Sequence, residues 1–258
     1  MSKLETDIVM VTYHRVEITL KTIIELWERT RTPFRLLVVD NSPSNSDIQN
    51  VLIDFYREGK IHKLILLNEN YGLERARNLL LPLIESKYCI FMDSDIMPQN
   101  SDPDWLSQLI ELFEDHPEYG AIALRPQAMV ASGNPFREYD KMRDAEKSKE
   151  FEVVPFTAAG YCRISLTEDI KKMGGWRNEF INGGLGHEEN YLRDKMKELG
   201  KKVGYARDLR CWHFFGDQGT WGYHKDLFAG HRDIWPRPKD VPFDWDSCIA
   251  IKPPIYGV

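Results

Sequence analysis

The chain has 258 residues, 42% of them hydrophobic and 29% charged, which suits one sizeable globular domain or at most two small ones. Its formal net charge of −6 gives no basic footprint for nonspecific nucleic-acid binding. Four scattered cysteines without C-x-x-C spacing indicate free thiols. No signal peptide is evident, and no apolar run approaches the roughly 20 residues of a membrane span, so we expect a cytoplasmic protein.

Strands and helices alternate through the first hundred residues. Each predicted strand is a continuous apolar run, and each predicted helix carries its apolar residues at helical spacing. Continuous rather than alternating apolar strands, separated by helices, indicate a parallel sheet that is covered on both faces. The predicted strands are 7–14, 34–41, 62–70 and 88–95, and the predicted helices are 16–30, 47–58 and 73–86.

The pattern changes after a predicted helix at 105–116. A charged segment, expected to be a solvated helix or a loop, lies between two strands, and a helix and late strand material follow. We therefore predict one domain over residues 1–215 and an aromatic- and proline-rich extension, 216–258, packed on it. The segments concerned are strands 119–130 and 150–160, the charged stretch 137–150, helix 187–200 and strand material at 202–216.

Polar residues follow each of the four N-terminal strands, at 12–15, 40–41, 68–70 and 93–95. In open α/β sheets, ligands bind beyond the carboxyl ends of the strands. One polar strand end is ordinarily a turn, but four at one edge of a sheet predict a cleft that could hold a nucleotide.

Asp93 and Asp95 stand one residue apart at the end of an apparently buried strand. An unpaired buried carboxylate is costly, so the pair either caps a turn or meets a cation. A D-x-D pair is weak evidence alone, and two others occur, at 102–104 before a helix, where an N-cap is expected, and at 244–246 in the tail. Mg²⁺ or Mn²⁺ typically takes one or two carboxylates plus a diphosphate, which predicts a metal–diphosphate site at Asp93 and Asp95.

These motifs together resemble the GT-A fold glycosyltransferases, most closely family 2, the inverting enzymes that use nucleotide sugars. The resemblance covers roughly 7–215 and implies a Rossmann-like, mostly parallel central sheet flanked by helices, with a smaller β element on the acceptor side. It divides the domain into a nucleotide-sugar half, 1–100, and an acceptor and catalytic half, 101–215. The matching segments are V-T-Y-H-R, V-V-D-N, N-E-N-Y-G-L-E-R-A-R-N, F-M-D-S-D, K-K-M-G-G-W-R-N-E-F and G-H-E-E-N-Y-L-R-D-K-M-K-E-L-G-K-K-V-G-Y.

The resemblance also implies cofactors, partners and residue roles. It implies Mn²⁺ or Mg²⁺, a nucleotide-sugar donor, most simply a UDP-sugar, and a hydroxyl acceptor that the sequence leaves open. The nucleotide-binding residues that it implies are Thr12, Tyr13, Arg15, Asp40, Asn70, Arg77, Asp93 and Ser94, and the metal ligands are Asp95, Asp93 and His213.

On the acceptor side the resemblance points to Gly175 and Trp176, although Trp176 could equally be a core residue. Glu189 stands where the family has the aspartate of its E-D pair and would be the general base, with Glu188 as the alternative. In a single in-line displacement, such a base takes the proton of the acceptor hydroxyl and the anomeric carbon is inverted.

Three other functions remain open at this point. A retaining GT-A enzyme would show the same sheet and D-x-D. A non-catalytic sugar-nucleotide-binding relative would be expected to lose the base or the D-x-D, and neither is lost. A nucleotidyltransferase usually opens with a glycine-rich phosphate loop, whereas the first strand here runs into T-Y-H-R without a glycine.

Overall fold

The computed structural model describes residues 6–44, 46–126, 151–155, 161–177, 187–213 and 249–250. The strands in this part of the chain are β1 (Thr6–Thr12), β2 (Arg35–Asp40), β3 (Lys63–Leu66), β4 (Tyr88–Asp93), β5 (Ile96–Pro98), β6 (Tyr119–Pro126), β7 (Val153–Pro155), β8 (Cys162–Leu166), β9 (Lys202–His213) and β10 (Ile249–Ala250). The helices are α1 (Val16–Arg29), α2 (Asp47–Arg57), α3 (Leu73–Leu80), α4 (Trp105–Asp115), α6 (Thr167–Lys172) and α7 (His187–Glu198), with a 3₁₀ turn at Leu81–Leu83.

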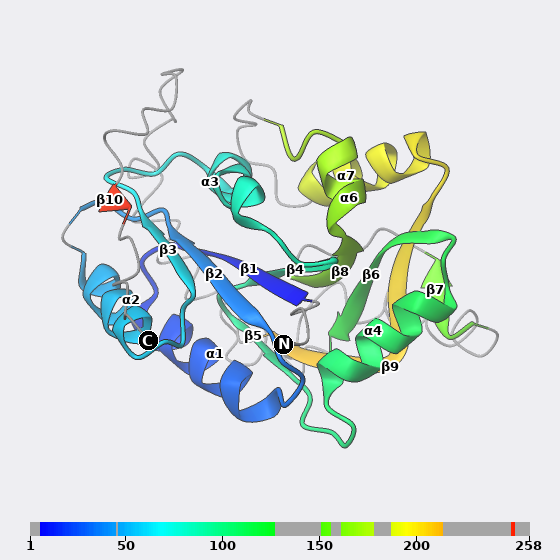
Figure 1. Ribbon diagram of the computed structural model, residues 1–258, viewed down its shortest axis with the longest axis horizontal. Coiled ribbons are helices and arrows are strands. Elements are labelled where there is room, and N and C mark those ends of the chain that lie inside the picture. Colours follow the sequence, from blue (N-terminus) through cyan, green and yellow to red (C-terminus); the bar gives the residue numbers. More distant parts are fainter. Residues whose placement is uncertain are drawn as a thin grey trace, which may run out of the picture.

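All of these strands belong to one sheet, in the order β10-β3-β2-β1-β4-β8-β6-β9-β5, and β7 pairs with β9 (Figure 1). The four N-terminal strands β3, β2, β1 and β4 are parallel neighbours, as predicted. In this register Thr12 pairs with Asp40, and Val11 pairs with Asp93. The polar residues that follow β1, β2 and β4 therefore meet at one edge of the sheet.

The second half of the sheet is mixed. β8 is antiparallel to both β4 and β6, whereas β6 runs parallel to β9. The short strands β5 and β7 lie antiparallel to β9, and β10 lies antiparallel to β3 at the opposite edge. This arrangement confirms the predicted α/β fold with a mostly parallel centre.

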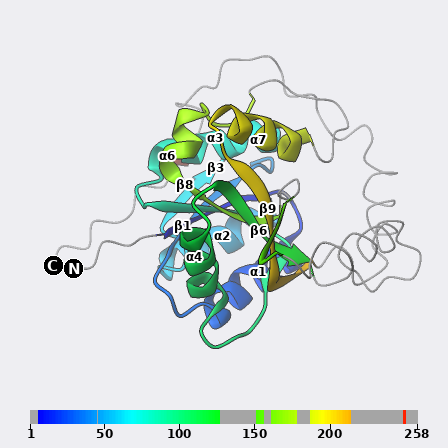
Figure 2. The same cartoon turned by 90° about the vertical axis from the view of Figure 1, so that its right-hand side faces the viewer.

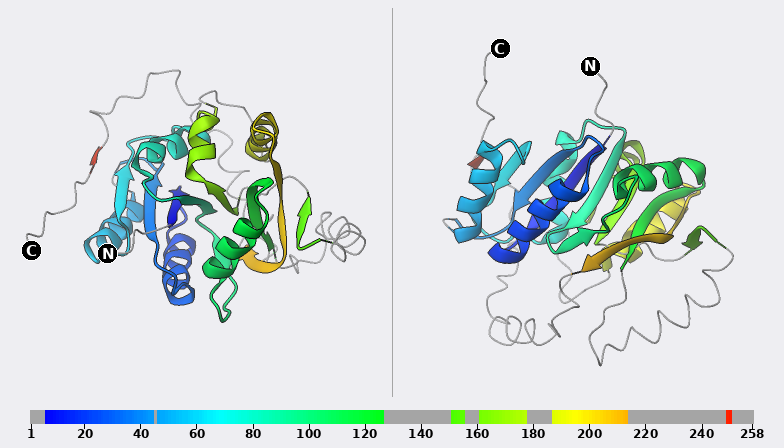
Figure 3. Two further views of the ribbon diagram at one scale, coloured as in Figure 1. Left: turned by 45° about the vertical axis from the view of Figure 1, so that its right-hand side comes forward. Right: turned by 90° about the horizontal axis from the view of Figure 1, so that it is seen from below.

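Helices cover both faces of the sheet, and a separate apolar core lies on each side (Figure 2). Successive strand residues alternate between the faces, so that Ile8 and Met10 pack in one core and Val9 in the other. The first core takes side chains from α1, α2 and α4, and the second from α3, α6 and α7. Two further views show helices on either side of the sheet (Figure 3). These two layers hold the strand ends, and hence the candidate site, in place.

Several predicted elements differ from those observed. The helix expected over 73–86 ends at Leu80 and gives way to a 3₁₀ turn, because Pro82 has no N–H to continue an α-helix. β5, β8 and α6 were not predicted. The charged segment 137–150 and most of the C-terminal extension lie outside the described residues, apart from β10. No helix of the described ranges is long and apolar enough to cross a membrane.

Asp7 forms a buried ion pair at the edge of the sheet opposite to the strand ends. Its carboxylate is fully buried and accepts hydrogen bonds from Arg35 Nε at 2.7 Å and Nη2 at 2.8 Å, and from the amides of Glu85 at 2.9 Å and Ser86 at 3.1 Å. Burial by itself raises the pKa of Asp7, but these hydrogen bonds and the charge of Arg35 outweigh it, so the net pKa lies below the ordinary value of 3.8.

Replacing Asp7 by Ala should lower the free energy of unfolding by about 3–5 kcal/mol, because Arg35 loses its buried partner. The stabilisation from Asp7 is complete above the ordinary pKa of 3.8 and is lost as the pH falls through the lower, folded-state pKa. Urea unfolding of the wild type and of Asp7→Ala between pH 7 and pH 2 measures the free energy of unfolding that Asp7 contributes at each pH. Glu85→Gln is the matched control, since that side chain is 67% exposed and should contribute less than about 1 kcal/mol. Equal losses in the two variants would contradict the prediction.

Candidate active site

Asp40 joins the ends of β1 and β2. The Thr12 hydroxyl donates to Asp40 Oδ1 at 2.7 Å, and the Ser42 hydroxyl donates to the same oxygen at 3.0 Å. The backbone N–H of His14 in turn donates to Ser42 Oγ at 2.9 Å. Burial raises the pKa of Asp40, and the hydrogen bonds from Thr12 and Ser42 oppose that rise. Because Asp40 is fully buried, in this structure it positions the turn after β1 and does not face solvent.

Asn70 shapes the turn that starts α3. Its Oδ1 accepts a hydrogen bond from Asn41 Nδ2 at 2.7 Å and another from the Gly72 amide at 2.8 Å, while the Tyr71 amide donates to Asn41 Oδ1 at 2.8 Å. Gly72 has φ +85°, a conformation that glycine adopts without strain. Burial raises the pKa of Tyr13, and its hydrogen bond with Asn70 opposes that shift. The structure thus brings two predicted nucleotide-binding residues, Tyr13 and Asn70, into contact.

The D-x-D turn links β4 to β5. Asp93 is the last residue of β4, with its side chain 31% exposed, and Ser94 is buried. Asp95 is almost fully buried, and its Oδ2 accepts a hydrogen bond from Arg15 Nη1 at 2.7 Å. His213 ends β9 and pairs with Ile96 of β5, which places its backbone beside this turn. The side chain of His213 lies outside the described part of the chain.

Arg77 connects the D-x-D turn with the start of α7, which is far away in sequence. Its Nη1 lies 2.5 Å from Glu188 Oε2, and its Nη2 lies 3.8 Å from Asp93 Oδ1. The guanidinium is 2% exposed and lies 5.7 Å from the ring centroid of Phe91 and 5.0 Å from that of Trp176. One arginine of α3 therefore holds two predicted site segments together.

The two glutamates of α7 have different surroundings. The side chain of Glu188 is 11% exposed, and its carboxylate contacts Arg77 at 2.5 Å and Arg163 Nη1 at 3.9 Å. Both oxygens of Glu188 thus lie beside buried arginines, which ties this carboxylate to α3 and β8. Glu189 follows in the same helical turn and is partly exposed. Of the two, Glu188 is the one whose carboxylate contacts Arg77 and Arg163.

Comparison with known proteins identifies the family. Residues 7–173 match the model of glycosyl transferase family 2. The chain belongs to this family. A search of curated proteins finds no match.

Solved structures show that this family 2 protein has the GT-A fold. It is similar to the mannosyltransferase PcManGT from Pyrobaculum calidifontis in complex with GDP-Man and Mn²⁺, with 17% identity and a TM-score of 0.64 over 91% of this chain and 66% of that one. It is also similar to S. aureus TarS 1-349 in complex with UDP, with 16% identity and a TM-score of 0.58 over 80% of this chain and 60% of that one. At these identities the likeness shows the fold alone, and the chain spans about two thirds or less of either protein.

The family 2 segments around Asn78 and Trp176 dock onto each other. Asn78 Nδ2 donates to the Trp176 carbonyl, and the Trp176 amide donates to Asn78 Oδ1, both at 2.8 Å. Gly175 has φ +76°, and a Cβ there would lie 2.5 Å from Leu81 Cδ1. Trp176 is 2% exposed and meets Phe91 edge-on, with the ring centroids 4.3 Å apart. In this structure Gly175 and Trp176 are therefore packing residues, and Trp176 cannot stack on an acceptor sugar.

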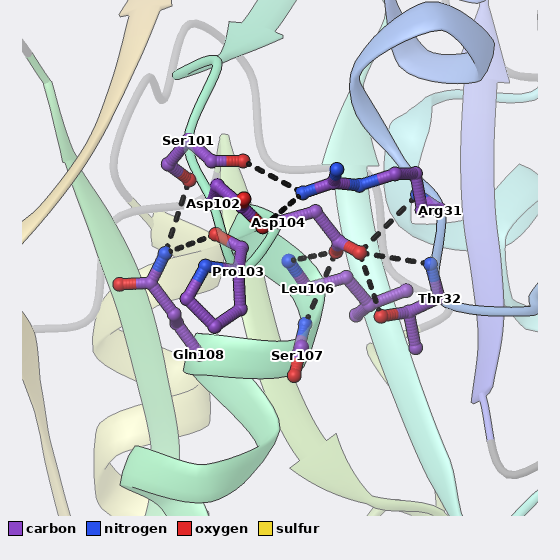
Figure 4. Close-up of polar contacts among 9 residues, drawn as sticks. All are labelled: Arg31, Thr32, Ser101, Asp102, Pro103, Asp104, Leu106, Ser107 and Gln108. Atoms are coloured by element: carbon purple, nitrogen blue, oxygen red, sulfur yellow. Dashed lines mark hydrogen bonds and ion pairs between the residues drawn. The ribbon is translucent and has the colours of Figure 1, made fainter.

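The second D-x-D pair, at 102–104, has a structural role (Figure 4). Asp104 is the N-cap of α4, and its Oδ1 accepts from the amides of Leu106 at 3.0 Å and Ser107 at 3.2 Å. Its Oδ2 accepts from the amide and the hydroxyl of Thr32 at 2.9 and 2.8 Å. Asp102 is 87% exposed. The N-cap prediction is confirmed, and the third pair, at 244–246, lies outside the described residues.

No individual role was assigned from the sequence to three residues that the structure places at the site. Asn41 and Ser42 follow Asp40 directly, and their side chains complete the turns described above. Arg163 of β8 is fully buried beside Glu188. Arg163 could have been found from the sequence Y-C-R-I-S-L, in which the arginine stands among residues that are otherwise uncharged. A charged residue is rarely buried in such a run unless it has a partner.

Proposed function

We propose that this protein is a metal-dependent glycosyltransferase that moves a hexose from a nucleotide donor, a UDP-sugar, to an acceptor hydroxyl with inversion. The observation that carries the proposal is the bridge made by Arg77, which lies 3.8 Å from Asp93 and 2.5 Å from Glu188. It puts the D-x-D turn and the glutamates of α7 around one point at the carboxyl ends of the strands, where α/β sheets bind ligands.

The residues at this point fit a divalent cation shared with a diphosphate. Among the described residues no group of three His, Cys, Asp or Glu side chains could hold a metal alone. Asp93 and Asp95 would supply the one or two carboxylates that Mg²⁺ or Mn²⁺ usually takes from protein when phosphate oxygens complete the shell. Bound there, such an ion would supply positive charge against the charge that develops on the leaving diphosphate. His213 is a further proposed ligand.

The protein's own residues would divide the remaining work. We place the base of the nucleotide against the turn that Thr12, Asp40 and Ser42 fix, with Tyr13 and Asn70 beside it. Arg15 and Arg77 flank the two aspartates and supply positive charge for the diphosphate. Glu189 would accept the proton of the attacking hydroxyl, while Glu188 holds Arg77.

A thermal-shift panel of nucleoside diphosphates and sugar nucleotides, with Mn²⁺ or EDTA, tests the proposal. A ligand at 100 times its Kd should stabilise the fold by about 2.7 kcal/mol. We expect the shift with UDP or a UDP-sugar, and only in Mn²⁺. A shift with GDP or dTDP would correct the donor class, and no shift with any nucleotide would contradict the proposal. NMR of the anomeric proton of the first product would separate inversion from retention.

A further inference from the structure

Arg163 is a buried charge whose guanidinium lacks hydrogen-bond partners. It is the second residue of β8, opposite Phe91 of β4, and its side chain is fully buried. Within the described part of the chain, none of its three guanidinium nitrogens has a hydrogen-bond partner. Burying a cation and leaving its donors unsatisfied costs free energy, so some benefit must offset it.

The neighbours of Arg163 belong to the candidate active site. Its Nη1 lies 3.9 Å from Glu188 Oε1, and its guanidinium carbon lies 5.8 Å from the ring centroid of Trp176 and 6.0 Å from that of Phe91. These two rings also face Arg77. Their π-systems offset part of the cost of burying both cations.

Glu188 thus lies between two buried arginines that come from different elements. Its Oε2 contacts Arg77 of α3, and its Oε1 faces Arg163 of β8. A carboxylate with a positive charge beside each oxygen is more restricted in its rotation than one that is contacted at a single oxygen. We propose that Arg163 is a positioning residue that, with Arg77, clamps Glu188 and so sets the first turn of α7 and the place of Glu189. This inference rests on the proposed role of Glu189 as the base.

A purely structural role would not favour an arginine at this position. An apolar side chain of similar volume would pack against Phe91 and Trp176 without the desolvation cost of a buried cation that lacks hydrogen bonds. Glu188 would keep its partner Arg77. Residues that reduce stability in exchange for activity are expected at functional sites.

Arg163→Met separates the two roles, with Arg163→Lys as the conservative variant. Sugar-nucleotide hydrolysis in Mn²⁺ gives kcat and KM without a known acceptor, and a thermal melt gives stability. We expect Arg163→Met to melt at or above the wild-type temperature while its kcat falls roughly tenfold or more with little change in donor KM. Arg163→Lys should recover part of kcat. An unchanged kcat, or a lower melting temperature with kcat retained, would overturn the proposal.

The double variant with Glu188→Gln tests whether Arg163 acts through Glu188. If it does, adding Arg163→Met to the Glu188→Gln variant should lower kcat little further. In the same way, Glu188→Gln should lower the melting temperature of the Arg163→Met variant less than it lowers that of the wild type. Additive effects would refute the clamp. The four melting temperatures, of the wild type, the two single variants and the double variant, are measured without turnover. They therefore test the clamp even if the wild type hydrolyses no donor. A wild type that hydrolyses no donor would count against the proposed function and not against the clamp.

Discussion

Glu189→Gln should leave donor binding intact and lower the rate of sugar transfer by about 100-fold or more, the usual scale for a lost general base. Glutamine has nearly the same shape but cannot accept the proton of the acceptor hydroxyl. Stability should change less than in Glu188→Gln, because Glu188 and not Glu189 forms the close contact with Arg77. The measurements are the transfer or donor-hydrolysis rate, the donor affinity and the melting temperature.

Glu188→Gln is the matched control for this variant, since it makes the same chemical change one residue away. It should lower the free energy of unfolding by about 3–5 kcal/mol, because Arg77 and Arg163 would lose the carboxylate that lies between them. The two variants thus differ in stability even if both are slow. If Glu188→Gln were stable and catalytically dead while Glu189→Gln stayed active, the base would be Glu188.

Asp95→Asn should abolish the stabilisation that a nucleotide gives in Mn²⁺. Asp95 is almost fully buried at the end of the D-x-D turn, and an amide is a much weaker ligand than a carboxylate for a hard divalent cation. The variant also leaves Arg15 without its ion-pair partner, but that side chain is 24% exposed and can be hydrated. Thermal shift with UDP, in Mn²⁺ and in EDTA, measures the effect.

Asp102→Asn provides the control from the second D-x-D pair. Its carboxylate is 87% exposed and pairs with Arg31, which is 63% exposed, so the pair should contribute less than about 1 kcal/mol. This variant should show the wild-type, Mn²⁺-dependent shift. If Asp95→Asn showed the same Mn²⁺-dependent thermal shift as the wild type, the metal site could not lie at this turn.

Local patterns in the sequence were enough for much of the fold. The predicted strands and helices of the first hundred residues correspond to β1 to β4, α1, α2 and the first part of the third predicted helix, and the prediction that Asp104 caps α4 is confirmed. Each depends on the apolar spacing or the capping chemistry of a few neighbouring residues. The same patterns put polar residues after four parallel strands, which was sufficient to locate the candidate site.

Only the tertiary structure decided how distant segments meet. Trp176 could be a core residue or a sugar platform until α3 and β4 were seen to enclose it. The insertion of β8 between β4 and β6 is a long-range pairing, and it carries Arg163 under the site. The resemblance points to Glu189 as the base with Glu188 as the alternative, and in the structure the two side chains differ because the helix docks with Glu188, not Glu189, against Arg77. The residue types and their order were thus sufficient for the class of chemistry, whereas the role of each carboxylate depends on the charges that packing brings beside it.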